Sequence, residues 1–200
     1  VRFCNDGTVE VRHGWTEMGQ GVHTVALQVA VEELGISSDN IRVIVDTTRQ
    51  LGFGQTTGSR GTLMAAASVQ RACHAATADG RKPEIDYMGE YVIDWTQHLG
   101  EPGVENPVIH STFGYAAQMV VIDRATQKIE TVIAVHDVGR AVNPQLCEGQ
   151  VEGSVHMGLG YALTEDFPSD ERGFPTNMTM KSLDILRPKD VPPIEVTLVE

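Results

Sequence analysis

The sequence is poor in the features that mark several common protein classes. Its 200 residues include three cysteines, each isolated, which lack the paired spacing of a zinc site. An iron–sulfur cluster normally takes four thiolates, or two close together in the fold where histidines replace the others, so we expect none in this chain. A sparse, odd number of cysteines suits a reducing compartment, so we expect a cytoplasmic protein. No run approaches the roughly 18 consecutive apolar residues that a membrane-spanning helix requires.

Positive charge is also scarce, because 15 Lys and Arg stand against 27 Asp and Glu, a net charge of −12. Such a protein repels polyanions, so neither nucleic acid nor an anionic membrane is an expected partner. The hydrophobic share of 41% and the charged share of 21% are ordinary for globular proteins and allow one sizeable core or two small ones. The amino end has neither an initiator Met nor an apolar signal core, and we expect the chain to be a piece of a larger protein.

The first 80 residues repeat one local pattern, a strand, a glycine-rich loop and a helix. Alternating and apolar runs predict the strands, and apolar residues at helical spacing predict the helices. The predicted strands cover residues 8–12 and 41–45, the loops 14–21 and 52–62, and the helices 22–34 and 63–78, with Gly35 as a C-cap. This order predicts an α+β fold made of layered α/β units, with the amides of both loops at one edge of a sheet.

The pattern breaks over residues 81–107, an irregular connection rich in Pro and Gly that holds one short strand at Tyr91–Trp95. We expect it to join two subregions, 1–80 and 108–200. The second subregion has two strand-like runs joined by a hairpin, then a helix that opens at Asn143 and Pro144, and a final strand. These elements are predicted at residues 116–123, 128–136, 143–164 and 194–199.

The tripeptide Gly19-Gln20-Gly21 is the first candidate for chemistry. Glycines let a main chain approach a ligand, the helix behind it presents amide donors, and a Gln carboxamide can both donate and accept. A plain turn with a surface Gln is the alternative.

Residues 55–62 are the second candidate, a loop with two glycines, several hydroxyls and Arg60 in front of a helix. Amides, hydroxyls and a fixed positive charge are the donors that bind phosphate. The loop has neither the Gly-Lys-Ser/Thr ending of a P-loop nor the G-x-G-x-x-G spacing of a dinucleotide site. A flexible loop capped by Ser or Thr is the alternative.

Gln150 is the third candidate, because it lies in a helix that also holds Gly153, Gly158 and Gly160. Three glycines weaken a helix, which suggests that a backbone or a ligand packs closely there. Glu148 and Glu152 share one helical face, where solvated charges are a simpler interpretation than acid–base catalysis. The histidines show no metal-ligand spacing, and no serine has the setting of a catalytic nucleophile.

Taken in order, four segments resemble the molybdenum-cofactor-binding portion of the xanthine dehydrogenase and aldehyde oxidoreductase family. They are residues 16–24, 57–62, 136–144 and 149–153. The resemblance covers nearly the whole chain and is weakest over residues 79–106. Residues 152–165 resemble the bacterial xanthine dehydrogenase-like members most.

The resemblance implies a role for each candidate. Gly19, Gln20 and Gly21 would contact the pterin of the cofactor, and Gln150 would face it again. The cofactor phosphate would be held by Thr57, Gly58, Ser59, Arg60, Gly61 and Thr62. Many members carry a small residue at the position of Arg60, so its role is open between a phosphate contact and a brace of the loop.

The resemblance also implies an enzyme that hydroxylates a purine, an N-heterocycle or an aldehyde carbon with oxygen from water. Its cofactor is molybdopterin, as the simple pterin or the cytosine dinucleotide. Iron–sulfur clusters and FAD lie on other domains or subunits, the rest of the molybdenum domain completes the site, and the parent enzyme is a dimer. The family's catalytic glutamate is expected beyond Glu200, so this chain holds no catalytic residue and is predicted to be inactive in isolation.

Two alternatives remain open at this point. One is a non-catalytic interaction module that binds a partner subunit without cofactor. The other is an unrelated phosphate- or nucleotide-binding domain.

Overall fold

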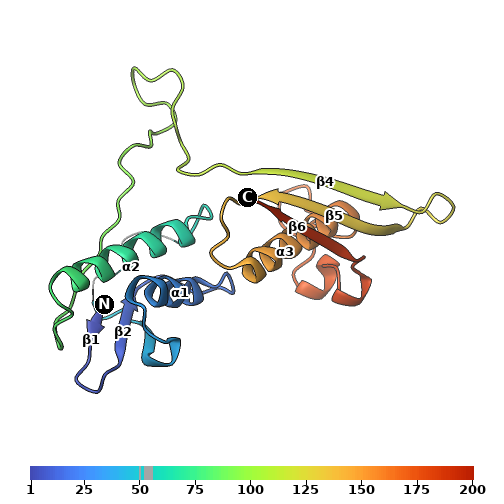
Figure 1. Cartoon of the computed structure of the whole chain (residues 1–200). Coiled ribbons are helices and arrows are strands. Elements are labelled where there is room, and N and C mark those ends of the chain that lie inside the picture. Colours follow the sequence, from blue (N-terminus) through green and yellow to red (C-terminus); the bar gives the residue numbers. More distant parts are fainter. Residues whose placement is uncertain (50, 52–55) are drawn as a thin grey trace. The chain divides into compact units, whose positions relative to one another are not determined.

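A computed structural model of the chain describes residues 1–49, 51 and 56–200. They form two compact units, Val1–Thr112 and Phe113–Glu200. Each unit contains a three-stranded sheet that mixes parallel and antiparallel neighbours and carries helices against it (Figure 1). The predicted α+β class with mixed sheets is therefore confirmed.

The first unit begins with a sheet in the order β1-β2-β3. Its elements are β1 (Arg2–Phe3), β2 (Val9–His13), α1 (Val22–Leu34), η1 (Ser38–Asn40), β3 (Ile41–Val45) and α2 (Gly61–Ala78). Strands β2 and β3 are parallel and α1 connects them, as the repeated pattern predicts. The predicted bounds of α1 and β3 are confirmed, and Gly35 caps α1 in the left-handed conformation that glycine favours.

The core of the first unit lies between β2, α1 and α2, and α1 and α2 lie side by side (Figure 1). Alternate residues of β2 point into this core, so Val9 and Val11 are fully buried. Ala26 and Ala30 on α1 are also fully buried, and these small side chains let the helix approach the sheet closely. Cys73 of α2 is buried in the same cluster.

The predicted strand at Tyr91–Trp95 is wrong, because this segment does not pair as a strand and its first residue lies against α2. Gly89 packs its backbone on α2 so closely that an added Cβ would overlap the carbonyl oxygen of Ser68. Arg71 of α2 then donates from Nη1 to the carbonyl oxygen of Glu90 (2.5 Å) and lies over the ring of Tyr91 at 4.9 Å from its centre. Contacts with a helix replace the predicted strand pairing. The irregular connection over residues 81–107 lies within the first unit.

The second unit has a sheet in the order β4-β5-β6. Its elements are β4 (Tyr115–Ile122), β5 (Ile129–Asp137), α3 (Pro144–Leu163), η2 (Met180–Leu183), η3 (Pro188–Asp190) and β6 (Ile194–Val199). The predicted hairpin is confirmed, since β4 and β5 pair antiparallel. Asn143 caps α3 as expected, and its Oδ1 accepts a hydrogen bond from the amide of Leu146 (2.9 Å).

The core of the second unit is one layer between α3 and the sheet, where Val132 and Ala134 of β5 meet Val151, Val155 and Leu159. A Cβ added at Gly153 or Gly158 would meet no atom within 4 Å, so no described part of the chain packs closely on these glycines. At Gly160 the neighbouring group is the side chain of Glu165. Of the two expected neighbours, a backbone or a ligand, the described chain therefore supplies none at Gly153 or Gly158, and close packing of a ligand there stays a prediction.

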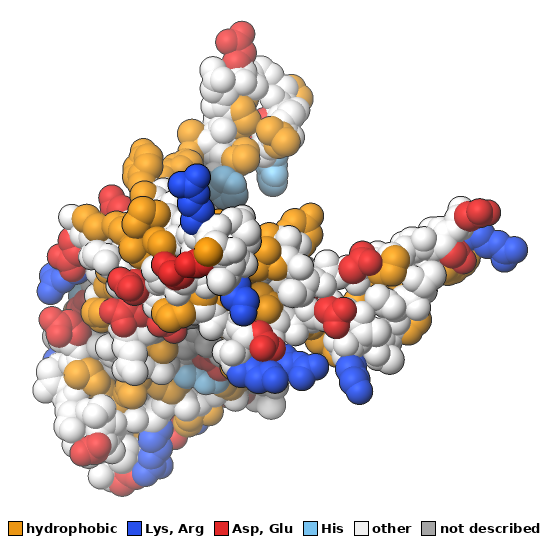
Figure 2. Space-filling view, turned by 90° about the vertical axis from the view of Figure 1, so that its right-hand side faces the viewer, with side chains coloured by type: hydrophobic (Ala, Val, Ile, Leu, Met, Phe, Trp, Pro, Cys, Tyr) orange, Lys and Arg blue, Asp and Glu red, His pale blue; other side chains and the backbone are white. Residues whose placement is uncertain are grey.

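Hydrophobic side chains also lie at the surface, between acidic ones (Figure 2). None of the described helices is both long and apolar enough to cross a membrane.

Candidate functional site

The segments that lead from β2 and β3 into the two glycine loops start at the same sheet edge. Parallel strands place their carboxyl ends together, so the loops after β2 and β3 begin side by side. The backbone amide of Thr16 in the first loop donates to Oγ1 of Thr56 in the second (3.3 Å). The loops therefore meet, as the sequence predicts. Residues 52–55 of the second predicted loop lie outside the described residues.

The first loop is closed by its own side chains. Gln20 is half-buried, and its carboxamide accepts from the amide of Met18 (2.6 Å) and donates to the carbonyl oxygen of Thr16 (2.7 Å). Gly19 and Gly21, on either side, have φ values of 99° and 83°, which glycine adopts without strain. Both ends of the Gln20 carboxamide are therefore bonded within the loop, and its contact with a ligand stays a prediction.

Glu17 binds the amides at the start of α1. Its Oε1 accepts from the amides of Gly19 (2.9 Å) and Gly21 (2.9 Å), and its Oε2 accepts from the amide of His23 (3.3 Å). Burial favours the neutral acid, but the three amide hydrogen bonds outweigh it, so the pKa of Glu17 is below its ordinary value. Glu17 is therefore a charged carboxylate at neutral pH.

A buried histidine at the end of β2, His13, holds the start of the same loop. Nδ1 of His13 accepts from the amide of Trp15 (3.1 Å), which requires the neutral ring with its proton on Nε2. Burial, and then the neighbouring ring of His23 at 5.0 Å between centres, lower the pKa of His13. Nε2 of each ring is buried without a hydrogen-bond partner among the described residues.

The second loop presents donors in front of α2. Thr57, Gly58 and Ser59 are exposed, and Gly58 and Ser59 both have positive φ, 61° and 53°. Among the described residues no side chain of the N-cap position closes the start of α2, and its first turn contains no acidic residue. The hydroxyls, the first helix amides and the half-buried Arg60 therefore form a set of donors suited to an anion.

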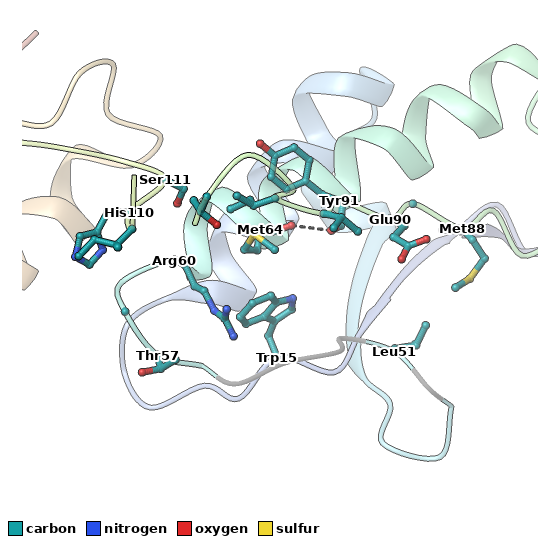
Figure 3. Close-up of a pocket in the computed structure, with 17 residues that line it drawn as sticks. Trp15, Leu51, Thr57, Arg60, Met64, Met88, Glu90, Tyr91, His110 and Ser111 are labelled. Carbon is teal, nitrogen blue, oxygen red and sulfur yellow. Dashed lines mark hydrogen bonds between the residues drawn. The ribbon is translucent and has the colours of Figure 1, made fainter. Parts of the chain in front are cut away.

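A cavity of about 680 Å³ adjoins this loop within the first unit. Trp15, Met64 and Tyr91 provide apolar lining, while Thr57, Arg60 and Ser111 add polar groups. Figure 3 shows the side chain of Arg60 extending from the loop toward the indole of Trp15. The sequence pattern does not mark Trp15 and Tyr91 as lining residues, although Trp15 lies within the predicted loop over residues 14–21.

The third candidate, Gln150, lies in the second unit, exposed on α3. Its carbonyl oxygen accepts from Oγ of Ser154 (2.9 Å). Glu148 and Glu152 on the same helix are exposed, in agreement with solvated charges. His156 has a structural contact, because Nε2 lies 2.9 Å from the carbonyl oxygen of Leu186. The structure thus brings the first two motifs together in one unit and places the third in the other.

Comparison with known families returns a match over almost the whole chain. The sequence profile of the family described as "Molybdopterin cofactor-binding domain" matches residues 1–82 and 74–192.

Two curated relatives are equally similar to this chain in sequence identity. The chain is 29% identical to the xanthine dehydrogenase molybdenum-binding subunit of Escherichia coli O157:H7, over 98% of this chain and 31% of the relative. It is 29% identical to the nicotine 6-hydroxylase large subunit of Paenarthrobacter nicotinovorans, over 100% of this chain and 30% of the relative. The chain therefore spans about a third of the length of these curated relatives.

A solved structure has the same fold. The aldehyde oxidoreductase from Desulfovibrio desulfuricans ATCC 27774 superimposes with a TM-score of 0.82 at 26% identity, covering 100% of this chain and 24% of that one.

Proposed function

Since the chain belongs to the molybdopterin cofactor-binding domain family, we propose that it holds part of a molybdopterin in a molybdenum hydroxylase. Family membership removes the alternative of an unrelated nucleotide-binding domain. The structural observation that carries the proposal is the meeting of the two glycine loops, joined by the hydrogen bond from Thr16 to Thr56. It brings Gln20 and the second loop to one sheet edge.

The second loop would hold the phosphate end of the cofactor. Phosphate carries two negative charges and accepts several hydrogen bonds, and residues 57–62 offer hydroxyls, helix amides and the guanidinium of Arg60. The donors present therefore fit this group. Arg60 is the only cation in that segment, and its side chain lies at the cavity wall beside Trp15 (Figure 3).

The first loop would lie along the pterin. Gly19 and Gly21 have no Cβ, so a planar ligand can approach the main chain there, and a Cβ at Gly19 would meet no atom within 4 Å. Gln20 and, from the second unit, Gln150 would offer their amides to the edge of the heterocycle. For Gln20 this requires exchanging its bonds within the loop for bonds to the ligand.

The parent enzyme would act on a purine, an N-heterocycle or an aldehyde. When bound, the molybdenum cofactor supplies the oxidative chemistry, with water as the source of oxygen. This chain's residues bind and orient the cofactor. The proton-accepting carboxylate, the rest of the cofactor site, the iron–sulfur clusters and the flavin would come from other segments or subunits.

The test is the molybdenum and pterin content of the protein purified as its gene encodes it. We expect one molybdenum per protomer, and we expect Arg60→Ala to lose most of it. A hydrogen bond to a charged group contributes about 1.5–3 kcal/mol, so retention of the cofactor should weaken roughly tenfold or more.

Arg124→Ala is the matched control, because Arg124 is exposed in the turn between β4 and β5. It should keep the wild-type content. Wild-type protein that purifies with neither molybdenum nor pterin from a host that makes the cofactor would favour the cofactor-free interaction module. Full retention by Arg60→Ala would remove Arg60 from the phosphate contact.

A further inference from the structure

The starts of α1 and α2 differ in which groups accept hydrogen bonds from their backbone amides. Each helix follows a glycine loop, so each presents amide donors and a partial positive charge at its N-terminus. At α1 the donors of Gly19, Gly21 and His23 are all bound by Glu17. At α2 the N-cap position provides no side-chain cap among the described residues, and the first turn has no acidic residue.

The contacts of Glu17 are those of an anion in a helix N-terminal site. Both carboxylate oxygens are used, and Oε1 lies 2.9 Å from two amide nitrogens. The N-cap residue, Gly21, has no side chain that could do this instead. The positive φ values of Gly19 and Gly21 turn their N–H groups to the same oxygen.

We infer that Glu17 is a positioning residue, a built-in anion that fills the N-terminal amide site of α1 and directs the anionic end of the ligand to the second loop. At the start of α1 the backbone amides that could bind a phosphate already donate to Glu17, and the negative charge of its carboxylate would repel the phosphate. At residues 57–62 it would find hydroxyls, helix amides and Arg60. That Glu17 stabilises its own loop follows from these hydrogen bonds. That it directs the anionic end of the ligand to residues 57–62 rests on the proposed function.

The same contacts fix the conformation of Gln20. Glu17 holds the residues on both sides of it, and the carboxamide of Gln20 then reaches Met18 and Thr16. Without the carboxylate, the amides of Gly19 and Gly21 lose their acceptor, and the loop between β2 and α1 loses its preferred shape. Glu17 therefore prepares the first loop before any ligand arrives.

The experiment is chemical rescue of Glu17→Ala in the protein as its gene encodes it, purified from a host that cannot make the cofactor. Removal of a helix cap should lower the melting temperature by roughly 2–5 °C. Sodium formate, compared with sodium chloride at equal ionic strength, should restore most of this loss, because formate can occupy the vacated carboxylate position. Inorganic phosphate should raise the melting temperature of Glu17→Ala more than that of the wild type.

Glu33→Ala is the matched control. Glu33 also lies on α1, but among the described residues it accepts from the side chains of Gln70 and His74 and from no backbone amide. Formate should not rescue it. Glu17→Gln, which keeps the shape and one acceptor oxygen but no charge, separates the charge from the hydrogen bonds and should also respond to phosphate.

Two results would overturn the inference. One is a melting temperature of Glu17→Ala that formate and chloride change equally, and the other is an equal response to phosphate in variant and wild type. Neither measurement needs the cofactor, so failure of the proposed function is seen separately, as wild-type protein without molybdenum from a host that makes it.

Discussion

The first unit, Val1–Thr112, packs two helices and a set of ion pairs around its sheet, whereas the second, Phe113–Glu200, packs one helix on its sheet and leaves β4 exposed. The ion pairs found among the described residues all join residues of the first unit. The unit that carries both glycine loops is therefore the one fixed by polar as well as apolar contacts.

Asp46 shows how the polar contacts serve the loops. It follows β3 directly, its amide donates to the carbonyl oxygen of His13, and its carboxylate accepts from Thr48 and Arg12. The hydrogen bond from Thr48, above all, and the bonds from Arg12 hold the pKa of Asp46 below its ordinary value. The segment that leads from β3 to the second loop thus starts from a fixed point beside the first loop. The described residues of the second unit contain no corresponding ion pair.

The largest effect is expected in the core of the first unit. Leu34→Ala removes a side chain that is 4% exposed, and such truncations cost about 2–5 kcal/mol of the free energy of unfolding. Both tryptophans, Trp15 and Trp95, lie in the first unit, so tryptophan fluorescence during urea unfolding of this chain reports that unit. We expect Leu34→Ala to shift the fluorescence transition to lower urea.

Leu159→Ala is the counterpart in the second unit, where Leu159 is 9% exposed. If the units unfold separately, it should shift the transition seen by circular dichroism and leave the fluorescence transition in place. Equal shifts of both transitions in both variants would show that the two units unfold as one cooperative structure.

The next effect concerns two glycines, one in each unit. Gly89→Ala would force a Cβ into the backbone of α2, and we expect a loss of about 1–3 kcal/mol. Gly153→Ala places a methyl group in open space within α3, and we expect a gain of about 0.5–1 kcal/mol, because alanine favours a helix. Melting temperatures of the two variants should move in opposite directions, and a neutral Gly89→Ala would mean that the segment beside α2 is not held there.

A smaller effect follows from the titration of His13 in the first unit. Its pKa is below the ordinary value of 6.5, so the unfolded chain binds the proton more tightly than the folded one. The stabilisation is present above about pH 6.5 and is lost as the pH falls through the folded pKa. Glu17 and Asp46, whose pKa values lie below their ordinary values near 4, act only in more acidic solution.

The measurement is the fluorescence-detected urea midpoint at pH 7.5 and near pH 5.5. We expect a lower midpoint at the acidic pH for the wild type and a smaller pH dependence for His13→Asn, which keeps an acceptor for the amide of Trp15. An identical pH dependence in both would assign the titration to another group.

Sequence alone predicts the regular elements well, because their signals are local. The bounds of α1 and β3 and the Asn143 cap follow from spacing, a C-cap glycine and the Asn-Pro pair. The predicted strand at Tyr91–Trp95 is wrong because the start of this mostly apolar segment contacts Arg71 of α2 instead of a neighbouring strand. Only tertiary packing decides between these two.

Part of the candidate site can likewise be predicted from the sequence, and part cannot. Residue types and glycine loops predict which donors exist, and parallel strands predict that the loops meet. The internal bonds of Gln20 and the position of the Glu17 carboxylate could not be predicted, since they depend on the φ angles of Gly19 and Gly21.

The smallest effect is expected on β4, where the comparison between the units is sharpest. Val120 of β4 lies directly opposite Val132 of β5, and opposite residues of an antiparallel pair share a face of the sheet. Val132 is 2% exposed beneath α3, while Val120 is 46% exposed. Val120→Ala should change the free energy of unfolding of this chain by less than about 0.5 kcal/mol, and Val132→Ala should lower it by about 1–3 kcal/mol. Because the two substitutions remove the same atoms from the same face, their difference isolates the contribution of α3. Equal losses would mean that β4 is as well covered as β5 in solution, and the contrast between a closed first unit and an open second one would no longer hold.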